Sequence, residues 1–410
     1  MSFLNPEKES PNYSIVFAVL STLFFMWGLI TVTNIMLAND LRTVFQLSYL
    51  EAISMNFLFF ATYFVMAVPS GKLIDKIGYR KGMMTGLGLA AVGCFLAYPA
   101  TGMRSYSFFM TALFIQATGI TILQVAANPY VALLGSRGRG ASKLTLVQAF
   151  NSLGAFVATL FASGFLMELS GLNERSYFNM SPEEIRNSVV QFVQLPFVLL
   201  GVVLVLLGVF LFFSRLPRIN TKEIEPLVLE SNPPRTQVWQ FSHAGLGALA
   251  IFAYVGAEVT IGTYLASVAS DLAVLYWGGA MIGRFVGSAL LVKLSPRKSI
   301  GIFSIIASLL VIGFMLIDAQ ISIYAIVAVG LFNSVLFPCI FTMGIDGLGK
   351  FSEEGSAMLI MAIVGGAVIP FVSHAMIEGK AGFILPVICY IFVAYFGLRG
   401  SRYPKRTNFY

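Results

Sequence analysis

Four amide side chains interrupt two apolar stretches of this sequence, and they are the residues best suited to bind a polar ligand. Gln124 and Asn128 lie in GITILQVAANPYVALLG, and Gln148 and Asn151 lie in LVQAFNSLGA. Residues three or four positions apart share one face of a helix. An uncharged amide both donates and accepts hydrogen bonds, as a sugar hydroxyl requires. We therefore predict that these four residues, joined by Asn34 in LITVTNIML, bind a polyol.

A structural role for the same amides is the alternative. An amide in hydrocarbon is unfavourable unless it finds a partner or lines a wet cavity. Asn and Gln side chains also hydrogen-bond one membrane helix to another. Either role suits any single residue, whereas four amides on two neighbouring segments favour a ligand site.

The composition indicates the environment in which this site lies. Of 410 residues, 57% are hydrophobic and 11% are charged, whereas a soluble domain carries about 25% charged residues. The apolar runs are continuous over roughly 20 residues, as in membrane helices and unlike the alternating strands of a barrel. The net charge of +7 does not point to nucleic acid, because the basic residues cluster in short loops. An all-α, multi-pass protein in contact with the lipid bilayer is predicted.

Twelve segments are expected to span the membrane. They run approximately over residues 14–38, 50–74, 82–102, 106–134, 143–168, 190–214, 241–268, 271–293, 299–318, 320–345, 355–377 and 380–400. Most Lys and Arg residues fall on one side of these segments, and the positive-inside rule makes that side cytoplasmic, together with both termini. Three cysteines lie in apolar segments and are expected to be buried and unpaired; they are Cys94, Cys339 and Cys389.

A polar stretch at 215–240 divides the chain into two six-helix halves, residues 1–214 and 241–410. A faint internal repeat supports this division, because Lys76, Arg80 and Lys81 align with Lys293, Arg297 and Lys298 at one constant offset. Pro129 similarly aligns with Pro338, which sets Gln124 opposite Asn333. Two pseudo-symmetric bundles of this kind hold a ligand between them near the middle of the membrane.

Glu258 is the most informative acidic residue, because it lies well inside the seventh segment in FAYVGAEVTIGTYLAS. An ionisable residue at that depth is a functional hypothesis by default. It could accept sugar hydroxyls, bind a cation or take up a proton. The structural alternative is an ion pair with Arg284 in the eighth segment. Trp277, like Trp27, lies inside a segment, where its ring could line the pocket or simply pack.

Residues 71–81, GKLIDKIGYRK, carry a pattern of charges that could act as a gate. A carboxylate near helix ends that pairs with Arg or Lys can hold two bundles together in one state and release them in another. The stretch matches the pattern G-x-L-x-D-R/K-x-G-x-R-K/R of the major facilitator superfamily. We assign gating to Asp75, Arg80 and Lys81; the alternative is an ordinary positively charged loop.

Several further stretches resemble the fucose permease branch of that superfamily, which includes the bacterial glucose/galactose transporters. They are FFMWG, QVAANPYVALLG, QAFNSLGA, YVGAEVTIG, GRFVGS and FNSVLFPCIF. The resemblance covers all twelve segments. It implies the major-facilitator fold and a monosaccharide–cation symporter that works by alternating access. The branch's span-five amides fall on Gln148 and Asn151, and its Asn-Pro falls on Asn128 and Pro129.

The sequence departs from the fucose–proton members at two positions. Those members have Asn-Asp where this chain has Asn34-Ile35, and a Glu where it has Gln124. Since neither Ile35 nor Gln124 can titrate, the fucose–proton mechanism cannot be transferred. Glu258 instead resembles the glucose/galactose branch, some members of which use sodium.

We therefore expect a monomeric hexose importer in the bacterial inner membrane, with Na⁺ favoured over H⁺ as the coupling cation. An uncoupled sugar facilitator and a membrane sugar sensor that does not transport are the alternatives. No Ser/His/Asp triad, metal-ligand cluster or phosphate loop is visible, so we expect no enzyme and no cofactor other than a coupling Na⁺.

Overall fold

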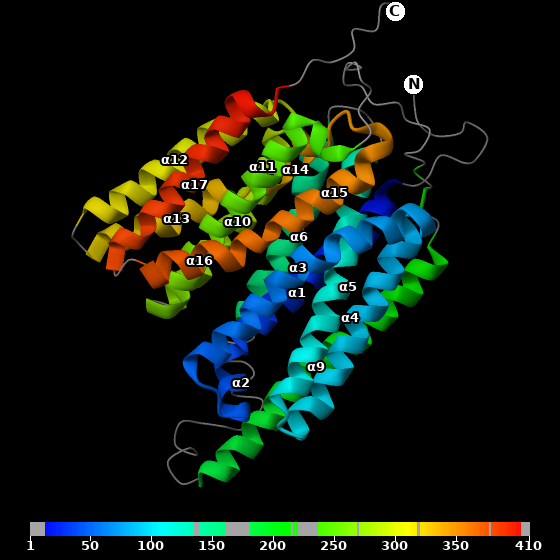
Figure 1. The fold of residues 1–410 in the computed structure, drawn as a ribbon, viewed down its shortest axis with the longest axis vertical. Helices are drawn as coiled ribbons and strands as arrows, with labels where there is room; N and C mark the ends of the chain where they lie inside the picture. The colour runs from blue at the N-terminus through cyan, green and yellow to red at the C-terminus, as the bar shows by residue number, and fades with distance from the viewer. Residues whose placement is uncertain are drawn as a thin grey trace, which may run out of the picture.

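The computed structural model describes residues 13–134, 139–160, 181–214, 216–217, 219, 237–268, 270–317, 320–376 and 379–402. Across these ranges the regular structure is helical, and long helices lie side by side (Figure 1). The prediction of an all-α fold is confirmed. Three cysteines that were expected to be unpaired are free and buried, namely Cys94, Cys339 and Cys389.

The first group of helices comes from the chain before residue 214. It comprises α1 (Tyr13–Met36), α2 (Ala38–Phe45), α3 (Tyr49–Ile77), α4 (Tyr79–Gly102), α5 (Tyr106–Leu133), α6 (Gly140–Leu160) and α9 (Pro182–Phe213). The short helix α2 connects the first two long helices. A capping box follows it, in which Ser48 and Glu51 satisfy each other's backbone N–H groups and start α3.

The second group comes from the chain after residue 237. After a short turn at Val238–Gln240 it comprises α10 (Ser242–Val268), α11 (Ser270–Leu290), α12 (Pro296–Leu316), α13 (Ile323–Asn333), α14 (Leu336–Ile345), α15 (Ser352–Met361), α16 (Gly365–Met376) and α17 (Ile384–Tyr395). Helices α13 and α14 follow one another along one broken span, as do α15 and α16. Counted in this way, the described residues form twelve long helical segments.

Ten of the twelve segments are long and apolar enough to cross a membrane. The other two are α6 and α11, each of 21 residues. They are less apolar because α6 carries Gln148 and Asn151, and α11 carries Arg284. Gln148 and Asn151, which were predicted to bind sugar, thus weaken the membrane signal of α6, and Arg284, the predicted ion-pair partner of Glu258, weakens that of α11.

One boundary differs from the prediction. The sixth span was expected to begin near residue 190, but α9 begins at Pro182. Ser181 caps its first turn together with Glu184, and a proline at the first position of a helix is favourable because its missing N–H has no intrahelical partner there. The polar first turns of α9 concealed its start, since the apolar run begins later. The end of the fifth span, residues 161–168, lies outside the described residues.

The two groups approach each other at one end of the molecule and diverge toward the other (Figure 1). We call the end at which α6 begins and α11 ends the closed end. There the Ser142 hydroxyl of α6 donates to the Ser288 carbonyl of α11 at 2.7 Å. Nearby, a Cβ placed on Gly71 of α3 would lie 2.9 Å from the Cβ of Ala357 on α15. The division at 1–214, 215–240 and 241–410 remains a proposal, because most of 215–240 lies outside the described residues.

Close backbone contact between α4 and α5 depends on a glycine. A Cβ on Gly93 would overlap the backbone nitrogen of Gln116, so no larger residue fits there without moving α5. Gly88 lies on the same helix, and a Cβ on it would meet no atom within 4 Å. Substitutions at Gly93 and Gly88 therefore distinguish the effect of glycine on helix packing from its effect on helix propensity.

We expect Gly93→Ala to lower the stability of the folded protein by about 1–3 kcal/mol, the usual effect of overpacking. Gly88→Ala should leave it unchanged or raise it by up to about 1 kcal/mol, because alanine favours the helix. The apparent melting temperatures of the two variants in one detergent provide the comparison. Equal melting temperatures would contradict the assigned contact between α4 and α5.

Candidate functional site

Gln124 lies at the centre of the first group with half of its amide unpaired. Its nitrogen donates to the Tyr63 hydroxyl of α3 at 2.8 Å, and the side chain of Trp27 on α1 reaches the same hydroxyl. Gln124 is only 1% exposed. Its amide oxygen has no hydrogen-bond partner among the described residues. A buried acceptor without a donor is unfavourable by about 1–3 kcal/mol, so this atom is prepared for a donor from a ligand or from water.

Asn128 and Gln148 continue this polar line from α5 to α6. The side-chain nitrogen of Asn128 donates to the backbone carbonyl of Gln124 at 3.0 Å. The side-chain nitrogen of Gln148 donates to Asn128 Oδ1 at 3.3 Å. Both side chains are buried. The structure therefore brings together three of the four amides that the sequence pairs suggested.

Asn151 has a different neighbour. Its nitrogen donates to the Phe24 carbonyl of α1 at 3.1 Å, which ties α6 to α1. Phe24 in turn packs against Trp27, with ring centroids 5.3 Å apart. In the state seen here, the donor half of Asn151 thus serves helix packing, and the side chain remains only partly buried.

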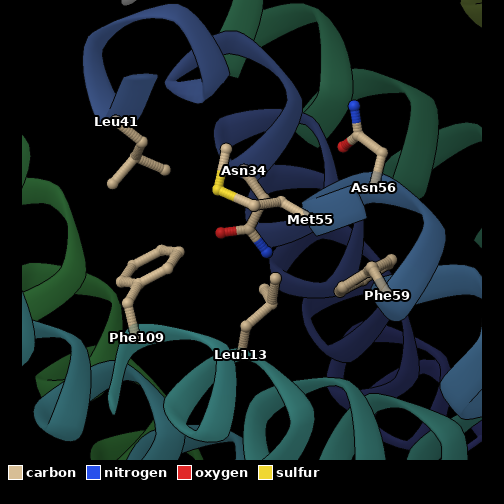
Figure 2. A pocket seen from close by; sticks show the side chains of 7 residues that line it. All are labelled: Asn34, Leu41, Met55, Asn56, Phe59, Phe109 and Leu113. Atoms are coloured by element: carbon tan, nitrogen blue, oxygen red, sulfur yellow. The ribbon is translucent and has the colours of Figure 1, made fainter. Parts of the chain in front are cut away.

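Asn34 lies apart from the other amides. Its nitrogen donates to Gln116 Oε1 at 2.7 Å, and the Gln116 nitrogen reaches Cys94 Sγ at 3.0 Å. Eight residues separate Gln116 from Gln124 on α5, a rise of about 12 Å. Asn34 Oδ1 is buried without a described partner. Its amide lies at the wall of a small pocket between Leu41 and Phe109 (Figure 2).

Glu258 on α10 accepts a hydrogen bond from Tyr254, one helical turn earlier, at 2.7 Å. Arg284 of α11 lies 3.9 Å from the same oxygen, so the ion pair named as the structural alternative is present but loose. The Glu258 side chain is 12% exposed and that of Arg284 is 9% exposed. Among acidic side chains in the described α-helices, Glu258 alone lies more than about one turn from a helix end.

Arg284 connects the second group to the first. Its Nε donates to the Ser334 carbonyl between α13 and α14 at 3.2 Å. Its Nη1 donates to the backbone carbonyl of Gln148 on α6 at 3.2 Å. The same nitrogen also donates to the Ser152 hydroxyl, one turn further along α6. One guanidinium thus bonds to the break between α13 and α14 and to the turn of α6 that carries Gln148, and lies near Glu258 of α10.

Asn333 lies in the polar cluster of the second group that also holds Glu258, because Tyr254 donates to the backbone carbonyl of Asn333 as well as to Glu258. Asn333 is fully buried, its nitrogen donates to Tyr276 at 2.9 Å, and its oxygen accepts from Tyr390 at 2.9 Å. Trp277, beside Tyr276, packs toward α10, since a Cβ on Gly262 would lie 3.0 Å from the indole ring. The predicted roles of Asn333 and Trp277 in sugar binding stay predictions, because both are engaged within the protein here.

Arg80, in the charged motif at residues 71–81, forms hydrogen bonds within the first group. Arg80 donates to the Leu211 carbonyl at 3.3 Å and to the Phe212 carbonyl, both at the end of α9 in the same group. Asp75 and Lys81 are exposed. Gly71 of the same stretch lies at a contact between the groups, against Ala357 of α15. The gating role of Asp75, Arg80 and Lys81 stays a prediction.

Several partners in these clusters escaped the sequence analysis. They are Tyr63, Gln116, Ser152, Tyr254, Tyr276 and Tyr390. A tyrosine in an apolar segment is usually interpreted as a packing residue. Only Tyr254 could have been found from its spacing, because it lies four positions before Glu258 and therefore on the same helix face. Among the described residues no group of three or more His, Cys, Asp or Glu side chains could hold a metal ion.

Known proteins resemble the chain along nearly its full length. The profile of the Major Facilitator Superfamily matches residues 16–399. The chain belongs to this superfamily. It is 39% identical to the glucose/galactose transporter of Brucella abortus, over 97% of each chain, and 29% identical to the L-fucose-proton symporter of Escherichia coli, over 97% of this chain and 95% of the relative.

A crystal structure of a superfamily transporter, FucP in its outward conformation, superposes on this chain with a TM-score of 0.80. The two sequences are 28% identical, and the match covers 95% of this chain and 99% of FucP. The protein is therefore a multi-pass membrane transporter with the major-facilitator fold and not an enzyme. The resemblance read from the sequence motifs is confirmed.

Two buried glutamines on α5 provide a test of the unpaired acceptor. Gln116 uses both its oxygen and its nitrogen, whereas Gln124 leaves its oxygen unpaired. We expect Gln116→Leu to lower the melting temperature of the ligand-free protein markedly, because it removes a satisfied polar pair. Gln124→Leu should lower it much less, because it also removes an unsatisfied atom. Thermal unfolding without sugar measures both, and an equal loss would show that Gln124 is an ordinary structural amide.

Proposed function

We propose that this protein carries a monosaccharide across the membrane by alternating access. The observation that supports this proposal most is the unpaired, buried oxygen of Gln124 next to the Asn128–Gln148 amide pair. Sugar hydroxyls supply the missing donors and can also accept from amide nitrogens. Trp27 packs against Phe24, whose backbone carbonyl accepts from Asn151, and its ring offers a surface for the C–H face of a sugar.

The names of the relatives support a hexose or deoxyhexose as the substrate in this proposal. These names give glucose, galactose and L-fucose as substrates, and this chain matches the glucose/galactose transporter more closely. The ligands in this proposal are Gln124, Asn128 and Gln148, with Asn151 one turn along α6 from Gln148 and Asn34 at the level of Gln116 on α5. Trp277, Asn333 and Glu258 act from the second group once the groups close over the sugar.

Coupling to a cation is the second part of the proposal, with Glu258 as the coupling residue. A carboxylate deep in a transporter bundle is a functional residue by default. Its loose distance from Arg284, 3.9 Å, leaves acceptor positions on the carboxylate for a cation. We favour Na⁺ over H⁺ because Ile35 and Gln124 cannot titrate, although a relative is named a proton symporter.

We also assign the state and the orientation. The contacts between groups at the closed end and the likeness to FucP in its outward conformation support a state open to the outside. The excess of Lys and Arg on the closed side then places that side and both termini in the cytoplasm. The bacterial sources of the relatives support the inner membrane as its location.

Uptake into sealed vesicles tests the transport cycle. We expect labelled glucose or galactose to accumulate above equilibrium when a Na⁺ gradient points inward. Accumulation driven only by a proton gradient would replace Na⁺ with H⁺. Uptake that reaches equilibrium and never exceeds it under either gradient would establish the uncoupled facilitator. Counterflow of labelled against unlabelled hexose excludes a sensor, because a protein that only binds sugar does not exchange it across the bilayer.

The substitution Glu258→Gln distinguishes cation coupling from sugar transport itself. The amide still accepts from Tyr254 but carries no charge to hold a cation, so accumulation should fall to equilibrium while counterflow persists at a reduced rate. Glu183→Gln is the control, because its exposed ion pair with Arg104 belongs to a class that contributes little. If cation-dependent accumulation survives in folded Glu258→Gln protein, Glu258 is only a structural partner of Arg284.

A further inference from the structure

The prolines of the fourth and tenth spans leave backbone carbonyls free at the boundary between the groups. A proline lacks an N–H and cannot bond the carbonyl four residues earlier. Pro129 therefore frees the Val125 carbonyl, and Pro338 frees the Ser334 carbonyl. The first accepts from the Ser356 hydroxyl of α15 at 3.1 Å. The second accepts from Arg284 Nε at 3.2 Å.

The Val125 carbonyl thus bonds directly across the groups, whereas the Ser334 carbonyl holds, within the second group, the arginine that reaches across. Ser356 and Val125 are fully buried and link α15 directly to α5. Arg284 reaches across to α6, where it donates to the Gln148 carbonyl and the Ser152 hydroxyl. Ser142 and Ser288 add a hydrogen bond between α6 and α11 nearer the end. Of the cross-group donors in these described contacts, only Arg284 is charged.

Arg284 also has an alternative partner within its own group. Glu258 Oε1 lies 3.9 Å from Nη2, beyond normal hydrogen-bond distance, while Nη1 is committed to α6. A buried guanidinium cannot be left without acceptors. When α6 and α11 separate, the acceptors on α6 are lost and the Glu258 carboxylate is the nearest replacement.

We infer that Arg284 is a latch between the two groups, which binds α6 while the closed end is shut and turns to Glu258 when it opens. In this role it is a positioning residue: it holds the turn of α6 that carries Gln148 and makes that turn's position depend on the closed end. The partners of Arg284 on the first group are a backbone carbonyl and a serine hydroxyl, so this contact does not require an ionisable residue there. The latch goes beyond the proposed sugar transport and does not depend on the identity of the sugar.

The rate at which the closed end opens can be read from a cysteine introduced by Thr145→Cys. Thr145 is fully buried on α6 and faces Gly287 of α11, so a thiol there is shielded until the two helices part. The native cysteines Cys94, Cys339 and Cys389 are buried and are expected to react slowly. N-ethylmaleimide, which crosses membranes, labels the introduced thiol in native membranes without any sugar.

In this background Ser152→Ala removes one acceptor of the guanidinium, and we expect labelling to speed up by roughly tenfold, as the loss of a hydrogen bond to a charged group would give. Arg284→Lys should act in the same direction, because a single ammonium cannot reach all the present acceptors. Ser304→Ala is the matched control: Ser304 is a buried serine on α12 whose hydroxyl has no described partner, and its loss should leave the rate unchanged.

A labelling rate in folded Ser152→Ala protein that equals the rate of the Ser304→Ala control, or falls below it, overturns the latch. If Ser152→Ala does not fold, Arg284→Lys decides by the same comparison. Because no sugar is added, failure here leaves the proposed transport function untouched. Conversely, a protein that transports no hexose could still show the faster labelling.

Discussion

The charge of Arg284 constrains the arrangement of helices around it. A buried guanidinium without partners is unfavourable by several kcal/mol, and replacement by a neutral packing residue is often better tolerated than loss of a single acceptor. Here the acceptors come from α6, α10 and the break between α13 and α14. None of these elements can shift far unless the others supply an acceptor in its place. The relative position of the two helix groups is therefore linked to one side chain, which donates to the Ser334 backbone between α13 and α14, and to the Gln148 backbone and the Ser152 hydroxyl of α6.

Buried polar atoms without a described partner occur in both groups, but the amide oxygens among them lie in the first group. In the second group, Asn333 has both amide atoms bonded to tyrosines, and Tyr254 donates to Glu258. In the first group, buried oxygens of Thr31, Asn34 and Gln124 have no described partner. Unpaired acceptors persist in folded proteins mainly where a ligand or water completes them. The first group thus offers unpaired amide oxygens to hydroxyl donors, whereas the amide of Asn333 in the second group is already bonded on both atoms.

The sequence predicted the helices well because length and apolar composition decide which segments cross a bilayer. The spacing also placed Gln124 and Asn128 on one face of α5, and Gln148 and Asn151 on one face of α6. The sequence could not assign partners across helices, because these depend on the depth and rotation of each helix. Asn34 therefore proved to pair with Gln116, and Asn151 with the backbone of α1. The start of α9 was missed for a related reason: its first turns are held by a cap and not by apolar periodicity.

The loose pair of Glu258 and Arg284 has a consequence for coupling under the proposed function. A cation that binds the free side of Glu258 would lie within several ångströms of the guanidinium, and two unit charges 4 Å apart repel by about 4 kcal/mol at an effective dielectric constant of 20. This repulsion would disfavour the turn of Arg284 toward Glu258 and would keep it on α6, so the cation would stabilise the shut closed end and the outward state. Sugar bound to Gln148 and to Glu258 would then be needed to compete with both interactions before the groups could rearrange. Such an order, in which the cation prepares the outward state and the sugar releases it, follows from the charges alone and requires no titrating carboxylate on the first group.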